Sequence, residues 1–189
     1  VETLGPRLSR QRANPRSASV DVAPVRTTTP DYMAYKPGVE ALRRVIHEPQ
    51  LLDGRLIPAM FTDLVQRTAY EALATDQPIV HCIDDLNRRG DEWAADLLAV
   101  LAVEEPLEAA PGDDVERHVD ELVAQLLRAA VQDALSDINR QMRDGVVTAE
   151  SGLTVIRDVR QRLELLGSHH GQLIEQELRE WLSDLGAQS

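Results

Sequence analysis

Histidine and cysteine are the side chains from which chemistry would first be expected in this 189-residue chain, which has five histidines and a single cysteine, Cys82. Metal ligands must converge on one point, but His169 and His170 are adjacent, so on a helix their rings point about 100° apart. His81 precedes Cys82, and neighbouring helical residues do not face each other, which argues against a thiol and base pair. We therefore expect no metal site among the histidines and a buried, structural Cys82.

Carboxylate clusters are the second place where chemistry could reside. Neither Asp84-Asp85 nor the group of Asp113, Asp114 and Glu116 lies in a glycine-bearing loop of alternating oxygen ligands, as calcium would require. Acidic residues at helix starts instead interact favourably with the helix dipole. The sequence contains no GxxxxGK[ST], GxGxxG, HExxH or CxxC motif. We expect no catalytic residue, no metal and no cofactor in this chain, and predict that it is not itself an enzyme.

Charge is distributed unevenly along the chain. The net charge is −12, but residues 1–36 carry six basic and three acidic residues, which leaves −15 for residues 37–189. An acidic body repels a phosphate backbone, so we expect no direct nucleic-acid binding there, and at most a weak contact by the basic tail. No apolar run approaches the roughly 20 residues that cross a bilayer, and no signal peptide is found. We expect a cytoplasmic protein without a membrane partner.

Composition and periodicity predict an all-α fold, in which a globular helical subdomain is followed by a long helix and a C-terminal helical hairpin. Aromatic residues make up 3% of the chain and hydrophobic residues 43%, a composition that favours helix packing over sheets. Residues 1–36 contain four prolines and no apolar period, which predicts a disordered linker. The globular subdomain is expected over residues 37–105, from apolar stripes that predict helices at about 37–48, 62–75, 78–88 and 92–103.

Residues 113–189 are expected to form the second unit. A helix of about 30 residues should end at Gly145, and Gly167 and Gly171 predict a kink or a split in the segment that follows. We expect the long helix and this segment to pack as an antiparallel hairpin that buries only part of its apolar stripes, which leaves surface for a partner. Trp181 either locks this hairpin or anchors the partner, and both interpretations stay open.

The stretch Glu40–Leu52 (EALRRVIHEPQLL), followed by Phe61 and then Ala69-Tyr70, resembles the opening of the C-terminal domain of bacterial DnaG-type primases. The resemblance covers about residues 37–189 and rests on apolar patterns. The high content of arginine and alanine indicates an actinobacterial-like source. It implies a globular part that modulates the replicative helicase and a terminal hairpin that docks on the N-terminal domains of that DnaB-type helicase. Primer synthesis would thereby be recruited to the replication fork at the nucleoid. We expect the docking contact to come from Leu173, Ile174, Leu178, Trp181 and Leu185.

Two alternatives stay open. The N-terminal domain of the helicase itself is similar in fold, but an ATPase with a phosphate loop should follow it, whereas here the linker lies upstream. A helical adaptor or oligomerisation domain unrelated to replication is the other alternative. Because the chain opens at Val1 inside a linker, we expect a larger parent protein. In the primase interpretation the parent is a nucleotidyltransferase that uses zinc and magnesium in its upstream domains.

Overall fold

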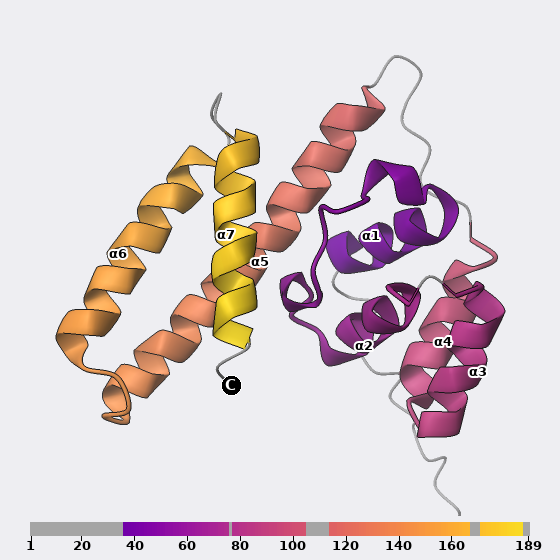
Figure 1. Cartoon of the computed structure of the whole chain (residues 1–189), viewed down its shortest axis with the longest axis horizontal. Coiled ribbons are helices and arrows are strands. Elements are labelled where there is room, and N and C mark those ends of the chain that lie inside the picture. Colours follow the sequence, from indigo (N-terminus) through magenta and orange to yellow (C-terminus); the bar gives the residue numbers. More distant parts are fainter. Residues whose placement is uncertain (1–35, 76, 105–113, 167–170, 187–189) are drawn as a thin grey trace, which may run out of the picture.

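A computed structural model describes residues 36–75, 77–104, 114–166 and 171–186. The expected linker therefore lies outside the described residues, apart from Lys36, and so do His169, His170 and the acidic segment 105–113. Within the described ranges the chain forms seven α-helices and two short 3-10 helices, without a strand, which confirms the predicted all-α fold (Figure 1). The elements are α1 (Lys36–His47), η2 (Pro49–Leu51), η3 (Pro58–Met60), α2 (Leu64–Leu73), α3 (Ile79–Arg89), α4 (Glu92–Leu101), α5 (Val115–Arg143), α6 (Ala149–Leu165) and α7 (Gly171–Gly186).

Local signals in the sequence set several of these boundaries. The Asp63 side chain caps α2 by accepting a hydrogen bond from the Gln66 N–H at 3.0 Å. The Asp114 side chain caps α5 by accepting from the N–H groups of Glu116 and Arg117. Gly90 has a φ of 86° and ends α3 in the left-handed conformation that glycine adopts without a Cβ penalty. Each boundary depends only on nearby residues, which is why it can be predicted from sequence.

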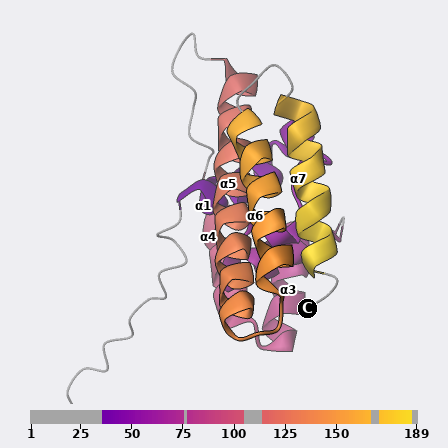
Figure 2. The same ribbon diagram turned by 90° about the vertical axis from the view of Figure 1, so that its left-hand side faces the viewer.

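The C-terminal part contains the predicted long helix, α5, followed by two helices, α6 and α7, which pack against each other as a hairpin. The segment after Gly145 is split into two helices, so α7 turns back along α6 and also packs against α5. Figure 2 shows the three helices side by side. The expected pairing of α5 with one final segment is therefore incomplete, since α7 covers apolar surface that a two-helix hairpin would have left open.

The turn between α5 and α6 is tightly built. Gly145 has a φ of 74°, and the Val146 N–H donates to the Gln141 carbonyl at 2.9 Å, which closes the end of α5 as a Schellman motif. Gly152 is buried, and a Cβ there would overlap the Met142 side chain, so glycine allows α6 to approach α5 closely.

One hydrophobic core runs through both parts of the chain. In the globular part Phe61 stacks on Tyr70 with ring centroids 4.9 Å apart, and Leu42 is fully buried in the same core. Helix α5 contacts α1 and η3 on one side and α6 and α7 on the other. The long helix thus connects the globular part to the terminal hairpin (Figure 1). No helix in the described ranges combines the length and apolarity needed to cross a membrane.

Candidate protein-docking surface

The five residues predicted to dock a partner do not share one exposed face. Ile174 is buried and Leu178 has 0% exposure, because this side of α7 packs into the core. Trp181 and Leu185 are partly buried and pack against the same core. Leu173 is different, since 57% of it is exposed. The expectation that Ile174 and Leu178 form a docking surface is corrected on this point: neither can contact a partner while α7 is in place.

Ion pairs also hold α7 against the rest of the protein. Arg55, in the loop between η2 and η3, donates from Nη2 to Glu175 at 2.8 Å and from Nη1 to Asp120 at 2.8 Å. The hydrogen bond that Arg55 donates to Glu175 is the largest cause that raises the pKa of Arg55 above its usual value, and burial opposes it. Arg179 lies near Glu175 and donates to the Gly54 carbonyl. The loop is thus fastened to both α5 and α7.

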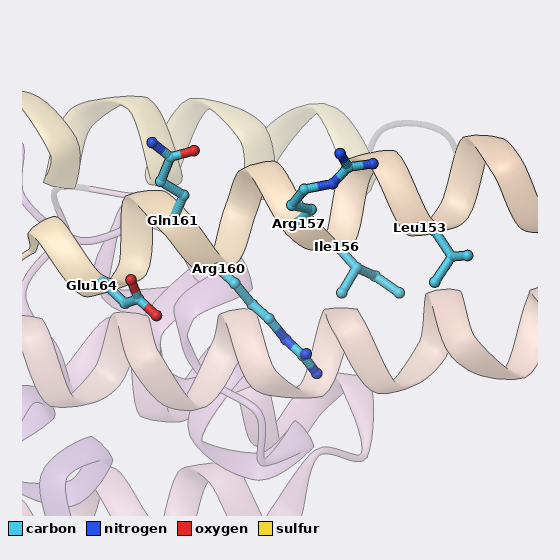
Figure 3. Close-up of a pocket in the computed structure, with 6 residues that line it drawn as sticks. All are labelled: Leu153, Ile156, Arg157, Arg160, Gln161 and Glu164. Atoms are coloured by element: carbon cyan, nitrogen blue, oxygen red, sulfur yellow. The ribbon is translucent and has the colours of Figure 1, made fainter.

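An open groove of about 550 Å³, which we call the α6 groove, is lined by side chains of α6, and Figure 3 shows these side chains. All of its lining residues come from α6. Figure 3 shows the side chains of Leu153, Ile156 and Arg160 directed toward α5, while Arg157 and Gln161 point to the other side of α6. The lining residues are Leu153, Ile156, Arg157, Arg160, Gln161 and Glu164.

The groove combines apolar surface with two arginines and one carboxylate, that of Glu164. Leu153 is 57% exposed, although it is a large hydrophobic residue on a helix surface. Arg157 and Arg160 form no ion pair with any residue that the structure describes, whereas Arg162 pairs with both Asp158 and Glu177. Unpaired guanidinium groups bind carboxylates in a bidentate geometry. The α6 groove can therefore hold a partner segment that carries both an apolar side chain and carboxylates.

Two of the residues that were first considered for chemistry, Cys82 and His47, make structural contacts. Cys82 is buried, and its Sγ donates to the Ala72 carbonyl at 3.3 Å, which confirms the small buried residue that was predicted. His47 Nε2 lies 2.9 Å from the Leu101 carbonyl and links α1 to the end of α4. In the described ranges no group of three or more His, Cys, Asp or Glu side chains could hold a metal ion. That the chain needs no cofactor stays a prediction.

Comparison with known proteins returns no match, whether to protein-family profiles, to curated proteins or to solved structures. The resemblance to primase C-terminal domains, and every role that it implies, therefore stays a prediction.

The α6 groove was not predicted from the sequence, because the predicted docking residues followed the apolar stripe of the last helix. A signal was nevertheless present in the sequence. Arg157, Arg160 and Arg162 lie within six residues, in a body that is otherwise acidic. Such a local change of sign is typical of a recognition surface, but only the structure separates the two unpaired arginines from the paired one.

Proposed function

We propose that this chain is the non-catalytic docking domain of a DNA primase, which binds the N-terminal domains of a DnaB-type replicative helicase. It would bring primer synthesis to the replication fork in the bacterial cytoplasm. In this proposal the domain makes no primer and holds no cofactor, since the zinc and magnesium chemistry belongs to upstream domains of the parent enzyme. In this proposal the acidic body, residues 37–189, does not bind nucleic acid.

The α6 groove is the observation that carries the docking role. Leu153 offers a partner exposed apolar surface, and Arg157 and Arg160 offer guanidinium groups, which is distinctive in a chain whose net charge is −12. Opposite charges across an interface speed association and favour the correct partner. The partner surface should accordingly present carboxylates around an apolar side chain.

The identity of the partner is supported by the resemblance in residues 40–70. Leu42, Phe61 and Ala69, which belong to the resembling stretches, are fully buried in one core. Their pattern is therefore the pattern of a packed helical subdomain, as the resemblance requires. The contact itself is assigned to α6, with Leu173 as the member of the originally predicted set that stays accessible.

Calorimetric titration with the purified N-terminal domain of a DnaB-type helicase tests the proposal. We expect micromolar binding without nucleotide, which Arg157→Glu/Arg160→Glu weakens at least about tenfold and which added salt also weakens. Comparing the affinities of Leu153→Ser and Leu173→Ser shows which of these two exposed leucines contacts the helicase domain. Arg89→Glu is the control, because it reverses an exposed arginine of α3, and α3 lies at the opposite side of the molecule from α6 (Figure 1).

Two outcomes would count against the proposal. Unchanged binding by the double arginine variant and by Leu153→Ser would move the interface away from α6. If the wild-type chain does not bind the helicase domain, the primase assignment is rejected. The chain would then be interpreted as an adaptor for another protein whose surface carries carboxylates. The α6 groove would then be tested against acidic amphipathic peptides.

A further inference from the structure

A second apolar surface lies on α4, far from the α6 groove along the chain. Trp93, Val100 and Val103 are 46%, 42% and 82% exposed, and we call them the α4 stripe. Residues seven apart on an α-helix lie only about 20° apart around its axis, so Trp93 and Val100 share one side of α4. The Val103 N–H donates to the Val100 carbonyl at 3.2 Å, so the turn that carries Val103 continues from the helix end.

The other side of α4 is the one that packs against the protein. It contacts α1, α2 and α3, and its buried residues are Ala94, Ala95, Leu97, Leu98 and Leu101. The exposed parts of Trp93, Val100 and Val103 lie outside this packed face. From Trp93 to Val103 the stripe is about 15 Å long at 1.5 Å per residue, which is close to three turns of a docked helix.

The charges around the stripe are mainly acidic. Helix α4 contains Glu92 and Asp96 and no basic residue, and neither carboxylate forms an ion pair with any residue in the described ranges. Asp96 lies between Trp93 and Val100 in the i+3 position and therefore on the same side of the helix. Residues 79–104 carry six acidic residues and two arginines.

Two of the nearby arginines are paired with carboxylates. Arg88 pairs with Asp85, and Arg43 is shared between Glu40 and Glu104. Arg89 donates only to the Asp85 main-chain carbonyl and keeps its charge, but the carboxylates without an ion pair among the described residues outnumber it: Asp84, Asp91, Glu92 and Asp96. The net charge beside the stripe is therefore negative.

We propose that the α4 stripe binds a basic amphipathic helix of a partner protein. Its apolar residues would cover Val100 and Val103, its arginines or lysines would meet Asp96 and Glu92, and Trp93 would be the aromatic anchor. A second copy of this chain fits poorly, since a symmetric contact would bring the same unpaired carboxylates together. This surface is independent of helicase docking, and its charge selects a different partner segment from the one that the α6 groove accepts.

A pair of synthetic 18-residue helices tests the proposal by calorimetry on the whole chain. Both carry leucine at i, i+3, i+4 and i+7 spacing, and one has arginine where the other has glutamate. We expect the arginine peptide to bind at least about tenfold more tightly, with a shift of the Trp93 indole N–H resonance in NMR spectra. Val100→Ser/Val103→Ser should weaken this binding at least about tenfold, and Asp96→Asn should weaken it and reduce its salt dependence.

Val146→Ser is the matched control, since Val146 is also highly exposed but lies in the α5–α6 turn. It should leave binding of the arginine peptide unchanged. If the double serine variant fails to fold, Asp96→Asn and the Trp93 resonance decide the matter. The proposal is overturned if the arginine peptide does not bind, if both peptides bind equally, or if Asp96→Asn and the α4 valine variants leave binding intact. Self-association of the chain that these variants abolish, measured by sedimentation, would also overturn it.

Discussion

Replacing Leu178 by alanine tests whether α7 is a core helix or a docking helix. Leu178 has no exposed surface in the structure, so Leu178→Ala removes packed atoms and leaves a cavity on the buried side of α7. Buried leucines of this kind lose about 3 kcal/mol of unfolding free energy on truncation. For a domain of this size the melting temperature should fall by about 6–12 °C.

Leu173→Ala on the same helix is the matched control, because it makes the same substitution at a residue that is 57% exposed. It should change the unfolding free energy by less than about 0.5 kcal/mol. Urea unfolding followed by circular dichroism measures both variants, and equal m-values would show that the same surface unfolds. If Leu178→Ala costs no more than Leu173→Ala, the α7 face is not buried by its own chain, and the reasoning that moved the docking surface to α6 fails.

Two further predictions concern polar contacts. Glu175→Gln leaves Arg55 paired with Asp120 alone and should cost about 1–2 kcal/mol, while Glu121→Gln, in an exposed pair with Arg117, should cost less than about 0.5 kcal/mol; urea titration compares them. Tyr70 donates to the Leu56 carbonyl at 2.8 Å, and burial is the main cause that raises its pKa above 10.0. Folding therefore favours the protonated phenol, so this stabilisation is complete below about pH 10 and is lost as pH rises through the folded pKa. Tyr70→Phe should lower stability by about 1 kcal/mol at pH 7 and flatten its fall above pH 10 in the same assay; an unchanged alkaline profile would show that Tyr70 does not cause the fall.

The helices themselves could largely be predicted from sequence because the signals that begin and end them are local. Stripes predicted at about 37–48, 78–88 and 92–103 correspond to α1, α3 and α4 within two residues at each end. Gly90 and Gly145 end their helices as predicted, since a left-handed residue is needed there whatever the helix packs against. Gly167 and Gly171 predict an interruption of the last segment but leave a kink and a split both open, and the structure has two helices there, α6 and α7.

What covers each apolar stripe was decided only by the tertiary structure. The spacing of Ile174, Leu178 and Leu185 identifies one side of α7 as apolar, but periodicity is the same whether a partner or the chain's own α5 buries that side. The same limit applies to charge. Arg162 is neutralised by Glu177 on the neighbouring helix, whereas Arg157 and Arg160 are not paired by any described residue. A sequence states which groups are present, but pairing and burial depend on distances between helices, and these distances arise only when the helices pack.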